Sequence, residues 1–316
     1  MKLFIKTLLL FTLFAVFFYC ISLFAWGHLL PSYLTPNLKY KMGLSGYMYT
    51  RLKEVKKTKA IDVLFLGSSH TYRGFDPRIF AGYHLSSFNL GSSNQTPVQT
   101  EDLLTLFLDS LKPGFIIYEV YPDNFITDGV ESSIDLISNN ELGNLSFNQA
   151  FKVNHIIGYN TLLFAAVRKS IFNDDAFVEP GRNALMGDTY IEGGFVQKDL
   201  KYNTETKVYT PKKWVLNKKQ VASFERSIKL IKKKNIPFVL VQAPVTKNLY
   251  YSYTNNPEVD RFFNQYGAYV NFNPAFNLSD SLDFFDEHHL NQNGVIKFNE
   301  KLIQQIKFQK KSVYLW

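Results

Sequence analysis

The chain has 316 residues, of which 46% are hydrophobic, so it is long enough to bury a sizeable core in one large domain or two small ones. Its formal net charge of +8 does not indicate a nucleic-acid partner, because the lysines are scattered and no module of basic and aromatic residues is present. The single cysteine, Cys20, excludes an intramolecular disulfide.

A long uncharged stretch lies near the start of the chain. Residues 7–26 are rich in Leu and Phe, and about 20 apolar residues are what a helix needs to cross a bilayer. Lys2 and Lys6 precede this stretch, so the positive-inside rule predicts that residues 1–6 are cytoplasmic and that the rest of the chain is extracytoplasmic. We therefore expect a single-pass anchor in a bacterial cytoplasmic membrane, followed by a stalk over residues 27–59.

A cleaved signal peptide is the alternative interpretation of this stretch. The apolar region of a signal peptide is normally about 7 to 15 residues long and ends at a site of small residues. Here the apolar region is longer, and the candidate exit, Ala25-Trp26-Gly27, fits such a site poorly. We therefore favour an anchor that stays on the chain.

From residue 60 onward, short apolar runs alternate with longer amphipathic segments, which predicts an α/β domain with a parallel sheet over residues 60–316. The expected strands are 61–66, 87–90, 115–120, 237–242 and 269–272, and the expected helices are 97–111, 217–234 and 293–308. Thr96, Pro97 and Gln99 form the clearest helix start, with an N-cap, a proline at the first helical position and a capping box. Residues of about 125–213 break the alternation, and we interpret them as an insertion that walls the site.

Two segments far apart in the chain carry the chemistry. Ser69 follows an apolar strand and Gly67, where the strand should turn into a helix and expose a hydroxyl at the carboxyl edge of the sheet. Near the other end, Asp286 lies three residues before His289, close enough to orient the imidazole through one ring nitrogen while the other faces the serine. The two segments predict an activated serine, with His288 as an alternative base.

These segments resemble the sequence blocks of the SGNH (GDSL-type) hydrolase superfamily, which occur here in order. The last block is the strongest match, since residues 286–294 read Asp-x-x-His-Leu-Asn-x-x-Gly with the family's spacing. The resemblance implies a three-layer, flavodoxin-like fold, with Ser69 as nucleophile, His289 as base and Asp286 as the residue that orients the base. Ser68 stands where the family usually has an aspartate that takes no part in the proton relay.

The resemblance also implies three donors to an oxyanion. They are the backbone N–H of Ser69, the backbone N–H of Asn94 in the second block, and an asparagine side chain that falls on Asp123 by direct alignment or on Asn124 with a shift of one residue. Asn94 replaces a glycine, yet it keeps its N–H and tolerates left-handed backbone angles better than most residues. An ionised Asp123 would repel an oxyanion, so the third block departs from the family pattern.

Two more side chains of the front segment are candidates for substrate binding. His70 directly follows Ser69, so its side chain should point away from the base and take a role at the helix start or toward the substrate. Arg73 lies one turn beyond Ser69. It either holds an anionic group of the substrate or pairs with Asp76.

The chain is similar to the membrane-anchored SGNH-like proteins of alginate O-acetylation and teichoic acid D-alanylation. The similarity lies in an anchor, an outward-facing domain, a Gly-Ser-Ser-His opening and a changed third block. We therefore expect a serine esterase or O-acyltransferase that acts on acyl esters, chiefly acetyl, of an envelope or secreted polysaccharide beside a multi-spanning membrane O-acyltransferase. The alternative is a non-catalytic protein that binds glycan or scaffolds such a complex. No residue pattern has metal-ligand spacing and no Gly-rich phosphate loop occurs, so we expect neither metal nor cofactor.

Overall fold

The computed structural model describes residues 1–43, 46–172, 177–179, 187–205 and 207–313. The chain divides into two compact units. One, here called the helical unit, consists of Met1–Met42 and Ser133–Val178, and the other, the sheet unit, consists of Gly43–Ser132 and Glu179–Trp316.

The sheet unit is built around five parallel strands. They are β1 (Val63–Leu66), β2 (Ser87–Asn89), β3 (Phe115–Glu119), β6 (Phe238–Gln242) and β7 (Tyr269–Asn271). Their order across the sheet is β2-β1-β3-β6-β7, and each neighbouring pair is parallel. The chain direction across the sheet reverses between β1 and β3, and in sheets of this kind ligands bind beyond the carboxyl ends of the strands at that point. The predicted α/β fold with a parallel sheet is confirmed.

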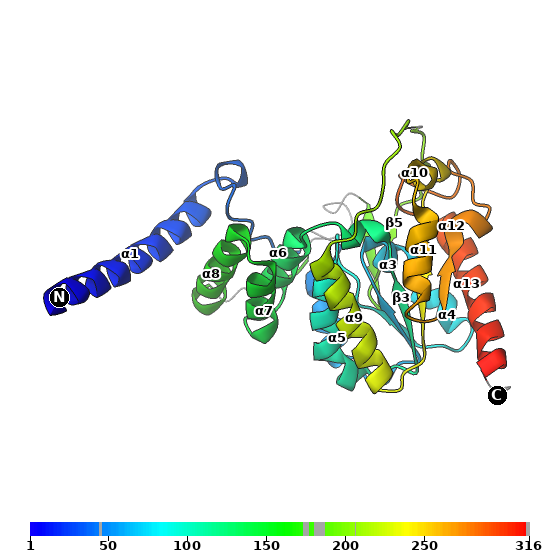
Figure 1. Ribbon diagram of the computed structural model, residues 1–316, viewed down its shortest axis with the longest axis horizontal. Helices are drawn as coiled ribbons and strands as arrows, with labels where there is room; N and C mark the ends of the chain where they lie inside the picture. Colours follow the sequence, from blue (N-terminus) through cyan, green and yellow to red (C-terminus); the bar gives the residue numbers. More distant parts are fainter. Residues whose placement is uncertain (44–45, 173–176, 180–186, 206, 314–316) are drawn as a thin grey trace. The chain divides into compact units, whose positions relative to one another are not determined.

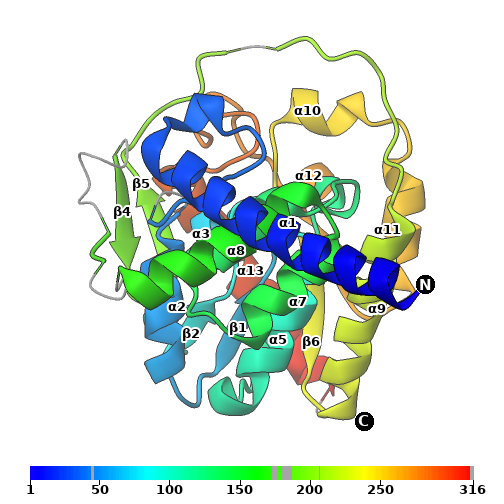
Figure 2. The same ribbon diagram turned by 90° about the vertical axis from the view of Figure 1, so that its left-hand side faces the viewer.

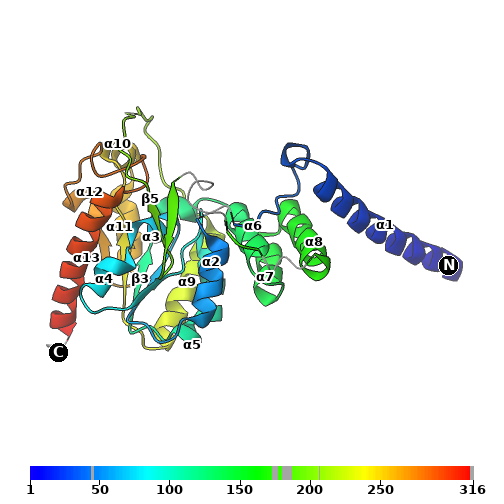
Figure 3. The ribbon, with the colours of Figure 1, turned by 180° about the vertical axis from the view of Figure 1, so that it is seen from behind.

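Helices cover both faces of this sheet (Figures 1 and 3). On one face, α5 (Pro97–Leu111) packs against α9 (Lys218–Lys233), and Tyr118 of β3 contacts Phe224 of α9. On the other, α13 (Gln292–Val313) places Phe298 in a core that includes Phe65 of β1. Both faces of the strands are therefore buried, which explains why the strands read as continuous apolar runs.

Shorter helices complete the sheet unit. They are α2 (Met48–Lys57), α3 (Ser69–Gly74), α4 (Pro77–Ala81), η2 (Pro122–Phe125), α10 (Lys247–Ser252), α11 (Asn256–Asn264) and α12 (Phe272–Ala275). The capping box at the start of α5 is present as predicted, with the N–H of Thr96 donating to Oε1 of Gln99 at 3.1 Å.

The stalk expected over residues 27–59 is not a single segment. Residues as far as Met42 belong to the helical unit, whereas α2 belongs to the sheet unit and buries Leu52 and Val55. Arg51 of α2 is fully buried and donates from Nε to the carbonyl of Gly194 at 3.0 Å. The sheet unit therefore begins near Gly43 rather than near residue 60.

The insertion expected at about residues 125–213 is also divided. Residues 133–178, with most of α6 (Val130–Asn139) and all of α7 (Asn144–Val153) and α8 (Ile156–Ile171), belong to the helical unit. The antiparallel hairpin of β4 (Asp188–Ile191) and β5 (Phe195–Lys198), whose strands lie side by side in Figure 2, belongs to the sheet unit. In the turn of this hairpin, the carbonyl of Gly193 accepts the N–H of Asn89 at 2.8 Å. Residues 125–132 and 179–213 of the expected insertion therefore belong to the sheet unit, and within them the hairpin is attached at the edge of the sheet formed by β2.

The helical unit contains α1 (Lys2–Leu29), the short helix η1 (Ser32–Leu34), and α6 to α8. Helix α1 is long and apolar enough to span a membrane. A small core of Ile137, Ala150, Leu162 and Ala165 holds α6, α7 and α8 together.

Candidate active site

The two segments predicted to carry the chemistry meet beyond the carboxyl end of β1. Ser69 is the first residue of α3, and its Oγ lies 2.9 Å from Nε2 of His289. The other ring nitrogen of His289, Nδ1, lies 3.0 Å from each carboxylate oxygen of Asp286. The three side chains thus have the contacts of a serine, its base and the carboxylate that orients the base. Among the described residues, no comparable contact joins Ser69 to His288.

The turn that presents Ser69 depends on close backbone packing. Gly67 has a φ of +142°, and a Cβ at this position would overlap the hydroxyl of Thr71 and lie 2.9 Å from Cβ of Glu119. Gly91, in the segment after β2, approaches from another side, where an added Cβ would lie 2.6 Å from the carbonyl oxygen of Ser68. The glycines therefore let the loops after β1, β2 and β3 pack closely around the serine turn.

The carboxylate of Asp286 is fixed by the backbone of its own loop. Its Oδ1 accepts the N–H groups of His288 and His289, each at 2.8 Å. Burial opposes ionisation of Asp286, but the hydrogen bond to His289 and the charge of that ring outweigh burial and hold its pKa below the ordinary carboxyl value. An ionised Asp286 favours the tautomer of His289 with its proton on Nδ1, which leaves Nε2 as the acceptor for the proton of Ser69.

The rest of the back block has a structural reason for its spacing. Oδ1 of Asn291 accepts the N–H groups of Asn293 at 3.0 Å and Gly294 at 3.2 Å, so Asn291 caps the start of α13. Gly294 lies against the carbonyl oxygen of Asp283, which a Cβ would overlap. The Asn-x-x-Gly part of the block thus anchors the loop that carries His289.

Two more imidazoles pack near His289. The ring of His70 lies with its centroid 5.2 Å from that of His289 and 4.3 Å from that of Tyr121, whose hydroxyl is 3.4 Å from Nδ1 of His288. Burial, with the charge of His289, lowers the pKa of His288, and the same two causes lower the pKa of His70 well below the ordinary value. Both rings are therefore neutral at neutral pH and add no positive charge beside His289.

The expectations for His70 and Arg73 need correction. His70 is only 6% exposed and lies beside His289 rather than away from it, because Tyr121 covers its ring. Arg73 donates from Nη1 and Nη2 to the two carboxylate oxygens of Asp188 at 3.1 and 2.7 Å, and Asp76 instead pairs with Arg78. Arg73 therefore ties the serine helix to the hairpin, and its guanidinium is already engaged by a carboxylate.

The oxyanion candidates lie in three segments, namely the start of α3 (Ser69), the loop between β2 and α5 (Asn94) and η2 (Asp123 and Asn124). Asn94 has a φ of +47°, the left-handed angle that its position in place of a glycine requires, and its side chain donates to Glu131 at 3.3 Å. Asp123 lies close enough to Tyr121 for its charge to raise the pKa of the buried phenol, after burial itself. Asn124 is buried, only 7% exposed. The carboxyl group of Asp123 therefore lies near Tyr121 at this end of the sheet.

A further acidic side chain, Glu119, was not singled out by the sequence. It ends β3 beneath the serine turn and is 2% exposed, and neither of its carboxyl oxygens has a hydrogen-bond partner in the described part of the chain. Burial raises its pKa to about 8, although the backbone N–H groups of Ala243, Tyr121 and Ser68 point toward it and oppose the rise. Glu119 is therefore mainly protonated at neutral pH.

This burial predicts a pH-dependent stability. Because the folded chain keeps the Glu119 proton up to about pH 8 and the unfolded chain loses it near 4.5, stability falls as pH rises between these values, by about 5 kcal/mol at most. Glu119→Gln should remove this loss. The melting temperature of the variant relative to the parent should rise from pH 5 to pH 8.5, as measured by thermal unfolding in one detergent. A constant difference across this range would show that Glu119 is ionised in the folded protein.

A polar pocket lies beside the back loop. Its volume is about 240 Å³, and it shares Glu287, the neighbour of Asp286, with that loop. The pocket is lined by polar side chains, namely Asn203, Glu205, Lys207, Tyr209, Thr246, Asn248, Asp280, Ser281 and Glu287. Lys207 bridges to Glu287 at 2.7 Å, and the backbone N–H of Thr246 donates to the carbonyl of Glu287 at 3.0 Å. A ligand in this pocket would therefore contact the same loop that holds Asp286 and His289.

Comparisons of the chain with protein families, with curated proteins and with solved structures find no match. Within the described residues, no group of three or more His, Cys, Asp or Glu side chains is arranged to hold a metal ion.

Proposed function

We propose that this chain is a membrane-anchored serine hydrolase or O-acyltransferase of the SGNH type that acts on acyl esters of an envelope or secreted polysaccharide. The observation that carries the proposal is the contact of Ser69 with His289 and of His289 with Asp286. The strand order and the helices on both faces support the three-layer, flavodoxin-like form of this fold.

In the proposed reaction, Oγ of Ser69 attacks the acyl carbonyl carbon while Nε2 of His289 takes the hydroxyl proton. Asp286 stabilises the imidazolium that forms, and the backbone N–H groups of Ser69 and Asn94 stabilise the oxyanion. Collapse of the tetrahedral intermediate breaks the ester bond, and the leaving alcohol takes the proton from His289. The acyl group on Ser69 then passes to water or to a sugar hydroxyl, which His289 deprotonates in the same way.

Two features support a polysaccharide as the substrate. The polar pocket beside the back loop offers hydroxyl, amide and carboxylate groups, which suit the hydroxyls of a sugar ring. A membrane anchor would keep the site near polymers that are exported across the membrane. A multi-spanning O-acyltransferase is the proposed source of acyl groups, with transfer as the physiological reaction and hydrolysis as a side activity.

Gene deletion with complementation tests the proposed function. Deletion should remove ester groups from an envelope or secreted polymer, and a Ser69→Ala allele should fail to restore them. Higher acylation after deletion would make the protein a deacylase, with Ser69 still the nucleophile. Unchanged ester content in every polymer fraction would remove the support for a polysaccharide substrate.

A non-catalytic scaffold or glycan-binding protein is the second candidate, and the position of Asp123 favours it. Its carboxylate occupies the block where the family places a neutral oxyanion donor, and its charge acts on Tyr121 within the same cluster as His288. A strain with Ser69→Ala that keeps normal acylation, while the deletion strain does not, would establish this candidate.

The anchor predicts a defined topology. Lys2 and Lys6 precede the apolar helix, so the N-terminus should be cytoplasmic and the sheet unit extracytoplasmic. A fusion of alkaline phosphatase to the C-terminus should be active in a bacterial host, and the protein should stay in the membrane fraction in carbonate. A shorter chain released into the soluble fraction would show that the apolar helix is a cleaved signal.

A further inference from the structure

Most of α1 has no protein around it in the described part of the helical unit. Residues as far as Tyr19 are exposed, whereas Ser22, Leu23 and Phe24 are half-buried. Of the proposed span, residues 7–26, the fully exposed part ends at Tyr19 and has about 13 residues, or about 20 Å at a rise of 1.5 Å per residue, against about 30 Å of bilayer hydrocarbon. Protein packing thus begins within the last third of the proposed span.

Helix α8 lies along that end of α1. The hydroxyl of Tyr19 donates to Oδ1 of Asn160 at 2.6 Å. Further along α1, the ring of Phe24 stacks on Phe164 and Phe172, with centroid distances of 5.4 and 5.8 Å. If residues 7–26 span a bilayer, these contacts hold α8 within about 10 Å of the boundary between hydrocarbon and headgroups.

Helices α7 and α8 expose large apolar side chains at helical spacing. On α7, Phe147 and Phe151 are one turn apart and 44% and 64% exposed; on α8, Ile156, Leu163 and Ile171 are 50%, 40% and 70% exposed. Phe151 contacts Tyr159 of α8 with ring centroids 5.6 Å apart, which joins the two rows into one surface. Tyr159 also packs against the small core of the unit, whereas the five apolar side chains above point away from it into solvent. Apolar exposure on this scale marks a contact with lipid or protein.

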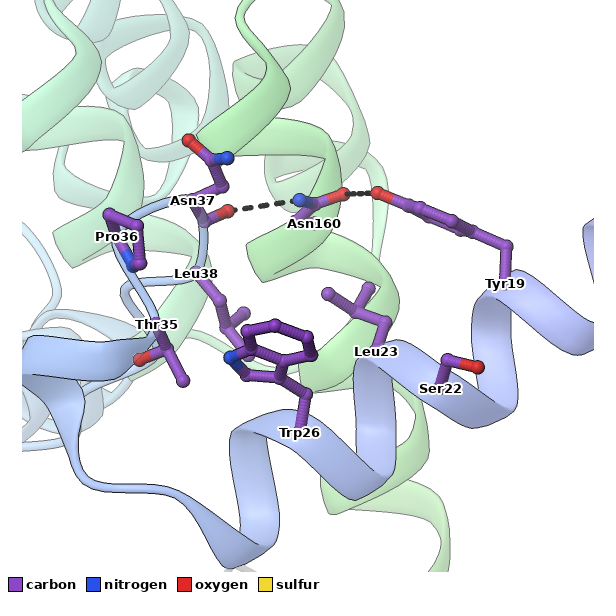
Figure 4. A pocket seen from close by; sticks show the side chains of 9 residues that line it. All are labelled: Tyr19, Ser22, Leu23, Trp26, Thr35, Pro36, Asn37, Leu38 and Asn160. Carbon is purple, nitrogen blue, oxygen red and sulfur yellow. Dashed lines mark hydrogen bonds between the residues drawn. The ribbon is translucent and has the colours of Figure 1, made fainter.

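A pocket of about 320 Å³ lies where α1, residues 35–38 and α8 meet (Figure 4). Leu23, Trp26 and Leu38 form apolar walls. At one end of the pocket, Oδ1 of Asn160 accepts a hydrogen bond from the hydroxyl of Tyr19, and Nδ2 of Asn160 donates to the carbonyl of Asn37 at 3.0 Å. Apolar walls with a polar end match the first part of a lipid chain and its ester group.

We propose that the helical unit is a lipid-binding element, in which α7 and α8 lie in the bilayer interface beside α1 and the pocket takes one acyl chain of a phospholipid. The occupant is lipid because the apolar surface and the pocket both belong to helices that adjoin α1 in the last third of its proposed span, where an interfacial helix buries its apolar face. This inference rests on the proposed membrane anchoring, but it is independent of any catalytic activity.

Spin labels on the full-length protein test the position of α7 and α8. With Cys20 replaced by alanine, single cysteines are placed at Phe151, Ile171, Leu13 of α1 and Val215 of the sheet unit. The protein is embedded in nanodiscs of phosphatidylethanolamine and phosphatidylglycerol, and the accessibility of each label to oxygen and to a water-soluble nickel chelate is measured. The ratio of oxygen accessibility to nickel accessibility should be several-fold higher at positions 151 and 171 than at position 215. The ratio at position 13 should also be several-fold higher than at position 215.

The labels separate the inference from its premise. A lipid-like ratio at position 13 with water-like ratios at positions 151 and 171 would overturn the interfacial position and leave the anchor intact. A water-like ratio at position 13 would overturn the anchor and the inference together.

Native mass spectrometry tests the pocket. The full-length protein released from mild detergent should retain one phospholipid, Ser22→Phe should lose it because the ring fills the pocket, and Ser22→Ala should keep it. Retention by Ser22→Phe, or no bound lipid on the parent protein, would overturn the assignment of the pocket.

Discussion

Replacing Ser69 by alanine is expected to lower kcat for hydrolysis of p-nitrophenyl acetate by about ten-thousandfold or more, which is the usual cost of removing the nucleophile of such a site. The reason is geometric, since Ser69 is the hydroxyl in contact with Nε2 of His289. The measurement uses initial rates of the purified full-length protein in detergent, together with labelling by a fluorophosphonate probe.

The neighbouring Ser68 supplies the matched control. It is 1% exposed, and its hydroxyl lies 3.4 Å from Nδ1 of His70 rather than near His289. Ser68→Ala should therefore keep labelling and most of the activity. Equal activity of Ser69→Ala and the parent protein would end the enzyme interpretation, whereas equal losses in both serine variants would indicate damage to the turn.

Replacing Asp286 by asparagine is expected to lower kcat by about ten-thousandfold, because an amide at this position favours the tautomer of His289 that cannot accept the Ser69 proton on Nε2. His289→Asn should be at least as severe, since it removes the base. The melting temperature should be measured for both variants, because Asp286 Oδ1 also binds two backbone N–H groups of its loop.

His288 is the control for the histidine assignment. Its ring contacts Tyr121, and its backbone N–H, not its side chain, binds Asp286. His288→Asn should therefore cost far less activity than His289→Asn. Similar losses at the two positions, with both variants folded, would leave the base unassigned.

Much of the sheet unit could be predicted because its signals are local. Apolar runs marked the strands, and Thr96, Pro97 and Gln99 marked the start of α5 to the residue. The placement of Ser69 followed from its position after a parallel strand, because residues after such strands gather at one edge of the sheet. The role of His289 followed from its spacing to Asp286 and from the resemblance of that block to the SGNH family. The meeting of these two residues therefore needed only the fold class and the two motifs.

Other features could not be predicted because they depend on distant residues. Asp188, the partner of Arg73, lies on a hairpin that the sequence did not distinguish from the rest of the insertion. Glu119 reads as an ordinary strand end, and only its packing under the turn at Gly67 shows that it is buried. The division of the chain into two units likewise follows from contacts between α1 and residues 133–178 that no local pattern records.

The central claim is that Ser69 carries the acyl group during turnover, and mass spectrometry of the acyl-enzyme tests it most directly. The full-length protein is mixed with excess p-nitrophenyl acetate, quenched in acid within the first turnover and digested. An acetyl group should be found on the peptide that contains Ser69, on its hydroxyl. It should be absent in Ser69→Ala and His289→Asn. Turnover of the ester with no acetyl group on Ser69, or with the acetyl group on another residue, would contradict the claim.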